Sequence, residues 1–166
     1  MTVKKSLILF GIIAGIALLT LLLRNGNGAS AVTETSSGRL VAETTMHDFG
    51  TISMGAGDVM QEYIVRNTGD DTLTITKAYT SCMCTVANVV DPTGKRSGAF
   101  GMPGHGPTPK ANITLAPGET ATVEAVFDPA AHGPSGVGLA ERTVYLETNS
   151  TATPTMELSF RAMVTR

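Results

Sequence analysis

The chain has 166 residues, of which 42% are hydrophobic, and its formal net charge is −2. Three of its basic residues flank an apolar N-terminal stretch, so that residues 25–166 hold 9 basic and 14 acidic residues and carry about −5. This acidic balance argues against a surface that binds the phosphates of a nucleic acid.

The N-terminal segment, residues 1–24, is predicted to be a single membrane-spanning helix. Residues 6–23 are 18 residues without a charge, with two lysines before them and an arginine after them. A helix that crosses a bilayer needs about 17–25 apolar residues, whereas the core of a signal peptide has about 7–15. The alternative is a cleaved secretory signal, because residues 29–31 form an A-x-A pattern. Both interpretations export the rest of the chain, and the two lysines favour a cytoplasmic N-terminus.

Residues 25–38 are small and polar and are predicted to form a flexible tether. The head, residues 39–166, alternates short apolar and polar runs with turn residues, which is typical of an all-β domain. The alternating runs lie near 40–43, 63–65, 73–75, 82–86, 123–127, 143–147 and 155–165. About seven short antiparallel strands are best accommodated by an immunoglobulin-like sandwich, with a small barrel as the alternative.

The two cysteines of the chain, Cys82 and Cys84, are separated by one residue. If this segment is extended, both lie on one face with their α-carbons about 6.5 Å apart, near the upper limit for a disulfide. A bridge across so short a loop removes little entropy from the unfolded chain, so a stabilising disulfide is a poor explanation. A packed pair, a metal site and a redox pair remain as alternatives.

Residues 91–110 are predicted to form a long loop, because they contain five glycines and four prolines. If the loop folds back, Met102 and His105 come close to Cys82 and Cys84. Two thiolates, a thioether and an imidazole form a soft ligand set that selects copper(I), whereas two thiolates and two imidazoles suit zinc. These four residues are therefore the candidate metal ligands, and a surface loop without a ligand is the alternative.

Two other histidines are assigned to the fold. His47 stands at the entry to a strand, where it can hydrogen-bond the adjacent turn. His132 lies in a predicted turn at 128–138 and is interpreted as a turn residue, with a further metal ligand as the alternative. The sequence has no G-x-S-x-G and no H-E-x-x-H motif, and its carboxylates are scattered singly, so it does not predict an enzyme.

Six ordered motifs run along the head: HDFGTI at 47–52, NTG at 67–69, SCMCT at 81–85, APGE at 116–119, FDP at 127–129 and TN at 148–149. Over about residues 45–164 they resemble a bacterial family catalogued as domain of unknown function 1573. That family is similar to Hydin-type immunoglobulin-like modules, and many members are exported or membrane-attached, so the resemblance implies this fold and location. The chain departs from the family in having Met83 where glycine is usual and in its longer segment before the APGE motif.

The predicted function is a membrane-tethered, extracytoplasmic binding or assembly module of the cell envelope, with an envelope protein as partner. An exposed strand edge of a sandwich can recruit an extended segment of another protein. The first alternative is storage or delivery of copper(I). The second is thiol–disulfide exchange, although the C-x-x-C spacing at a helix start that lowers a thiol pKa is missing.

Overall fold

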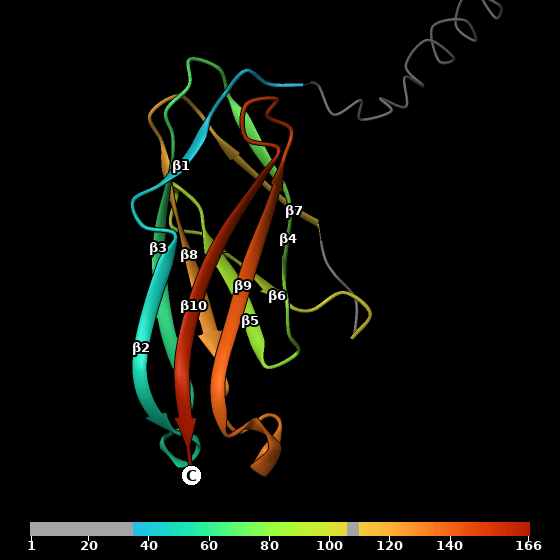
Figure 1. The fold of residues 1–166 in the computed structure, drawn as a ribbon. Helices are drawn as coiled ribbons and strands as arrows, with labels where there is room; N and C mark the ends of the chain where they lie inside the picture. The colour runs from blue at the N-terminus through green and yellow to red at the C-terminus, as the bar shows by residue number, and fades with distance from the viewer. Residues whose placement is uncertain (1–34, 106–109) are drawn as a thin grey trace, which may run out of the picture. The chain divides into compact units, whose positions relative to one another are not determined.

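The computed structural model describes residues 35–105 and 110–166 (Figure 1). The predicted anchor at 1–24, and all but the last residues of the predicted tether, lie outside the described residues. Within the described part of the chain, no helix has the length and apolar character needed to cross a membrane.

The described residues form two five-stranded sheets packed face to face (Figure 1). The order of the first sheet is β1 (Leu40–Ala42), β3 (Val59–Asn67), β8 (Thr120–Phe127), β5 (Thr85–Val90) and β6 (Arg96–Phe100). The order of the second is β2 (Met46–Ser53), β10 (Thr155–Thr165), β9 (Gly138–Thr148), β4 (Leu73–Thr80) and β7 (Lys110–Leu115). Two short 3-10 helices, η1 (Met54–Ala56) and η2 (Gly133–Gly136), lie at the same end as the C-terminus. An all-β sandwich is therefore confirmed, and the barrel is not formed.

The predicted count of about seven strands, all antiparallel, is wrong. Between β1 and β2 the chain crosses from one sheet to the other, so β1 pairs with β3 while β2 pairs in parallel with β10. Residues 91–110 were expected to be a loop, yet β6 lies inside this segment and pairs with β5. Its five residues include few apolar side chains in alternation, so the sequence carries only a weak strand signal there.

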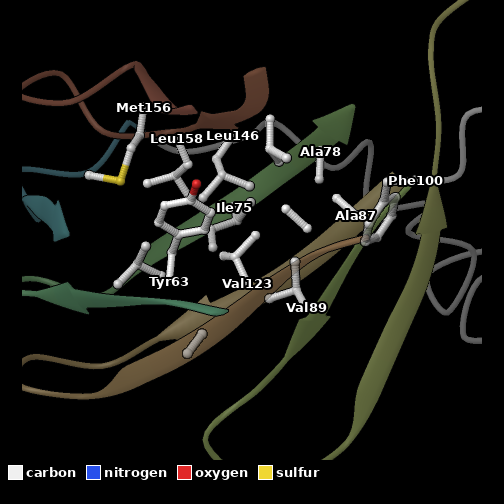
Figure 2. Packing of buried hydrophobic residues seen from close by; sticks show 14 of the residues in the cluster. Tyr63, Ile75, Ala78, Ala87, Val89, Phe100, Val123, Leu146, Met156 and Leu158 are labelled. Atoms are coloured by element: carbon white, nitrogen blue, oxygen red, sulfur yellow. The ribbon is translucent and has the colours of Figure 1, made fainter. Parts of the chain in front are cut away.

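The core lies between the two sheets and follows the predicted alternation closely. In β10 the buried residues are Met156, Leu158, Phe160, Ala162 and Val164. Figure 2 shows Tyr63 and Val123 of the first sheet facing Ile75, Leu146 and Leu158 of the second. Burial of apolar surface contributes about 25 cal/mol for each Å² and is the main favourable contribution to the stability of such a core.

Tyr63 places a polar group inside this core. Its side chain is fully buried, and its hydroxyl donates a hydrogen bond of 2.6 Å to the backbone carbonyl of Ser159 on β10. The bond joins the two sheets, because Tyr63 lies on β3 of the other sheet. Burial raises the pKa of the Tyr63 phenol to about 12, since the ionised form would lose its hydration.

Replacing Tyr63 with phenylalanine is expected to lower the free energy of unfolding by about 1 kcal/mol at neutral pH. The stability of the variant should also depend less on pH in alkaline solution. The folded pKa lies above the unfolded value of about 10, so the phenol stabilises the fold fully below pH 10 and loses this contribution as pH rises toward 12. Urea titrations between pH 8 and pH 12 should show a shallower alkaline decline in Tyr63→Phe than in the native chain. Equal slopes would contradict this assignment.

Candidate functional site

The cysteines lie in a tight turn between β4 and β5, and not in an extended strand as the sequence suggested. The backbone N–H of Thr85 donates to the carbonyl of Cys82 at 3.1 Å, which closes the turn. The hydroxyl of Thr80, which is buried, donates to the carbonyl of Cys82 at 2.9 Å. The turn connects the two sheets, since β4 and β5 belong to different ones. The extended segment on which two thiols would share one face is therefore not formed.

Cys82 and Cys84 form a disulfide. The turn brings their α-carbons to 5.3 Å, well inside the range for a bridge and shorter than an extended chain allows. The two sulfurs have different surroundings: Cys84 is only 3% exposed and belongs to the core, whereas Cys82 is half-buried and packs at the border of the core. A reagent in solution therefore has more access to Cys82 than to Cys84.

The buried sulfur lies beside a guanidinium group. The Nε–H of Arg142, on β9, donates to the Sγ atom of Cys84 at 3.0 Å. The Arg142 guanidinium also lies over the ring of Phe127, with 6.0 Å between the guanidinium carbon and the ring centroid. Arg142 follows Ala140 on the inward-facing side of β9, so the charge lies at the end of the core and not on the outer face. A thiolate formed at Cys84 would have this cation as its nearest charge.

The half-buried sulfur lies beside a histidine. The Nε2 atom of His132 is 3.3 Å from the Sγ atom of Cys82. His132 is exposed and lies in the connection between β8 and β9. This connection is held to the cysteine turn, because the N–H of Asp128 donates to the carbonyl of Cys84 at 2.9 Å. His132, interpreted from the sequence mainly as a turn residue, thus contacts the disulfide directly.

The predicted metal ligands are brought together only in part. The ligand atoms of Cys82, Cys84 and His132 all lie within 4.8 Å of one another, and within the described residues His105 does not join this group. The part of this segment that follows β6 begins beside the cysteine turn, because Thr80 N–H donates to Gly101 carbonyl at 3.2 Å. His105 then closes a turn of its own with Met102, its N–H lying 3.2 Å from the Met102 carbonyl.

Cys82, Cys84 and His132 can bind a metal only after the Cys82–Cys84 disulfide has been reduced. Thiolates bind copper(I) or zinc, whereas the sulfurs of a disulfide do not present that ligand. The copper(I) site with Met102 and His105 stays a prediction, which metal analysis of the reduced protein would test. Sequence reasoning overlooked Arg142, because an arginine 58 residues from Cys84 in an alternating strand gives no sign of which atom it will contact.

A second feature is an open hollow of about 310 Å³ at the other end of β4. It is lined by Arg66, Asn67, Thr68, Gly69, Asp70, Pro117 and Gly118. Backbone groups of its wall bond within the protein: Asn67 N–H donates to Glu119 carbonyl at 3.0 Å, and Gly118 N–H donates to Asn67 carbonyl at 2.8 Å. The hollow is best explained as the junction of two structural turns.

A third feature is an open edge of the first sheet. β1 pairs only with residues 65–67 of β3, whereas β8 covers residues 59–66 on the opposite side. Within the described residues, 59–63 have no strand partner on the side away from β8. Two apolar side chains lie on the outer face beside this edge, Met60 at 51% and Ile64 at 40% exposed. The Glu62 carbonyl on this edge accepts a hydrogen bond from the Gln61 side-chain amide. A strand edge without a strand partner, next to exposed apolar side chains, is a surface that can accept another strand.

Residues 40–96 match the family model described as protein of unknown function (DUF1573). The matched segment contains the NTG and SCMCT motifs, so it supports the domain family that these motifs indicated. The relation to Hydin-type modules stays a prediction. No curated protein matches the sequence.

Several solved structures are similar to this chain in fold. A protein of unknown function from Porphyromonas gingivalis has 14% sequence identity and a TM-score of 0.55, and the match covers 83% of this chain and 51% of that one. This chain therefore spans about half the length of that protein. The ASH/PapD-like domain 7 of human CEP192 has 16% identity and a TM-score of 0.46, with coverage of 79% and 87%. The periplasmic chaperone SfaE has 10% identity and a TM-score of 0.41, with coverage of 77% and 58%. At 14% identity, the similarity to the Porphyromonas gingivalis protein describes the fold alone.

Proposed function

We propose that this protein is an extracytoplasmic binding or assembly module of the cell envelope, held at the membrane by its N-terminal segment. In this proposal residues 1–24 span the membrane with the N-terminus in the cytoplasm, and the sandwich recruits one segment of an envelope protein. The observation that carries the proposal is the open edge of β3, defined by residues 59–63, with Met60 and Ile64 exposed beside it.

The occupant is an extended, apolar segment that adds a strand to β3. Met60 and Glu62 are the residues of this stretch whose backbone groups point away from β8, since the neighbouring Ile64 carbonyl accepts from Glu43 N–H on that side. Backbone hydrogen bonds to these two residues would supply affinity, and alternate side chains of the added strand would lie on the outer face with Met60 and Ile64. The partly buried Val126 of β8 is paired with Met60 and extends the apolar surface across the sheet. Charged residues normally protect such edges from pairing, and here one charged residue, Glu62, lies between the exposed apolar side chains of Met60 and Ile64.

The double substitution Met60→Lys and Ile64→Lys is expected to abolish partner binding while changing the free energy of unfolding by less than about 1 kcal/mol, since both side chains lie on the solvent-facing side of the sheet. The measurement is chemical crosslinking in intact cells, followed by purification of the full chain and identification of the crosslinked protein by mass spectrometry. The matched control is Met163→Lys on β10, which is 45% exposed on the outer face of the other sheet.

The proposal requires one protein that is captured by the native chain and by the Met163→Lys control, and lost from the double variant. Equal capture by all three chains would place the binding surface elsewhere. Capture of nothing by the native chain would argue against a binding module.

A further inference from the structure

We infer that the Cys82–Cys84 disulfide is a reactive site that oxidises thiols, with Cys82 as the sulfur attacked and Cys84 as the leaving group stabilised by Arg142. The co-substrate is a molecule with two thiols, or two molecules with one thiol each. This inference does not rest on the proposed function, because the strand edge of β3 contributes nothing to the chemistry.

Access decides which sulfur reacts first. Cys84 is 3% exposed and lies against the core, and Cys82 is half-buried at the surface. An incoming thiolate must approach along the axis of the S–S bond to the sulfur it attacks. Cys82 meets this requirement better, because the chain around it is a surface turn in which Met83 is 54% exposed.

The exchange balances in two steps. A thiolate of the co-substrate attacks Cys82 Sγ, the S–S bond breaks, and the electron pair of that bond goes to Cys84 Sγ. A mixed disulfide with Cys82 results. The second thiolate of the co-substrate then attacks the co-substrate sulfur of this mixed disulfide, so Cys82 leaves with the electron pair and takes up a proton. The co-substrate ends as a disulfide, having given two electrons to the cysteine pair and two protons to the solvent. Cys82 takes one proton back from the solvent, and Cys84 keeps its negative charge beside Arg142.

Arg142 makes Cys84 a good leaving group. Its Nε–H already lies 3.0 Å from the Cys84 sulfur, so no rearrangement is needed when negative charge develops there. A hydrogen bond from a cation to an anion is about twice as strong as one between neutral groups. The guanidinium is placed by its contact with the Phe127 ring and by a hydrogen bond of 2.8 Å from its Nη1 to the Glu141 carbonyl.

His132 lies beside the Cys82 sulfur and can stabilise it in the reduced form. Its Nε2 atom is 3.3 Å from Cys82 Sγ and can donate a hydrogen bond to this sulfur when Cys82 leaves the mixed disulfide. Groups that stabilise the reduced form make a disulfide a stronger oxidant. Arg142 and His132 both act on the reduced form, so the pair is expected to accept electrons and to oxidise its co-substrate.

The test uses the full chain in detergent, equilibrated with mixtures of reduced and oxidised glutathione, then quenched in acid and analysed by mass spectrometry. We expect the native chain to exchange with glutathione and to carry the mixed disulfide on Cys82. A Cys84→Ser variant should retain glutathione on Cys82, and a Cys82→Ser variant should leave Cys84 unmodified. Glutathione on Cys84 in preference to Cys82, or a disulfide that glutathione never opens, would overturn the inference.

The role of Arg142 is tested by Arg142→Met, which keeps much of the side-chain volume and removes the charge. The equilibrium constant for reduction by glutathione should fall about tenfold, and Arg142→Lys should restore part of it. The matched control is Arg161→Met, since Arg161 pairs with Asp48 on the outer face, away from the cysteines. An equilibrium constant within twofold of the native value in folded Arg142→Met would overturn the role of Arg142.

Two kinds of co-substrate are compared to identify the source of the thiol. One is a small thiol, either glutathione or reduced dithiothreitol, and the other is a reduced unfolded protein that contains cysteines. Faster reaction with the protein than with glutathione at equal thiol concentration would assign the site to protein thiols. The reverse order would assign it to small thiols. If neither the small thiols nor the unfolded protein reacts with the disulfide, the inference is overturned, and the proposed strand binding is unaffected.

Discussion

Replacing Asn67 with alanine is expected to lower the free energy of unfolding by about 3 kcal/mol, which corresponds to a fall of roughly 10 °C in Tm for a domain of this size. The Asn67 side chain is fully buried at the end of β3 and makes four hydrogen bonds. Its oxygen accepts from the backbone N–H groups of Arg39 and Gly69, both at 3.1 Å. Its nitrogen donates to the carbonyls of Asp71 and Leu115, at 2.8 and 3.0 Å.

Two further variants separate lost hydrogen bonds from lost volume. Asn67→Asp has nearly the same shape but removes both donors and directs a carboxylate oxygen at the carbonyls of Asp71 and Leu115, so it should be at least as destabilising. Thr68→Ala, at the exposed neighbouring position, should change stability by no more than about 0.5 kcal/mol. Thermal and urea unfolding measure all three. A loss below about 1 kcal/mol in Asn67→Ala would show that water replaces these bonds.

Replacing Phe160 with alanine is expected to cost about 3–5 kcal/mol, because a large buried ring is removed and a cavity remains. Phe160 is fully buried on β10, and its ring lies between two other aromatic rings. The ring of Phe49 on β2 is 5.4 Å away at 78°, and the ring of Phe127 on β8 is 5.3 Å away at 48°. The three rings therefore join β2 and β10 of one sheet to β8 of the other.

Phe160→Leu should cost less than the alanine variant, since leucine fills part of the volume. Met163→Ala on the same strand is the matched control, and a change within about 0.5 kcal/mol is expected because Met163 is 45% exposed. Urea unfolding at neutral pH provides the comparison. Equal losses in Phe160→Ala and Met163→Ala would show that the aromatic contact between the sheets is energetically unimportant.

The sequence predicted the central strands well because their burial alternates with period two. In β10 all five apolar residues at even positions from Met156 to Val164 are buried, as the pattern requires. It failed where pairing depends on contacts distant in the chain. The parallel pairing of β2 with β10 joins residues more than 100 positions apart, and no local pattern distinguishes it from an antiparallel pairing.

The motifs that indicated the family have structural explanations. In NTG, the Asn67 side chain ties together three separate segments, through Arg39, Asp71 and Leu115. A Cβ atom on Gly69 would lie 2.6 Å from the backbone nitrogen of Arg39, so a larger residue would not fit there. In HDFG, the Asp48 side chain accepts a hydrogen bond of 2.8 Å from the N–H of Gly50, whose φ of 66° favours glycine. These residues support the fold, so the resemblance predicted architecture better than activity.

For the cysteines, spacing alone was misleading. A C-x-C pair in an extended strand holds its sulfurs apart, and the turn that shortens the distance is closed by Thr80 and Thr85, two residues with no evident signal in the sequence. The sequence also lacked the helix start that activates familiar redox cysteines. In the structure Arg142 supplies the positive charge instead, from a strand 58 residues away from Cys84.

The most direct test of the central claim, that an envelope protein adds a strand to the open edge of β3, is site-specific photocrosslinking in living cells. A photoreactive amino acid is placed at position 60 or, as the control, at position 163, in the otherwise native full chain. A single crosslinked partner from position 60 and none from position 163 is the predicted result, with the crosslink mapping to one extended apolar segment of the partner. No crosslink from position 60, or the same products from both positions, would contradict the proposed function.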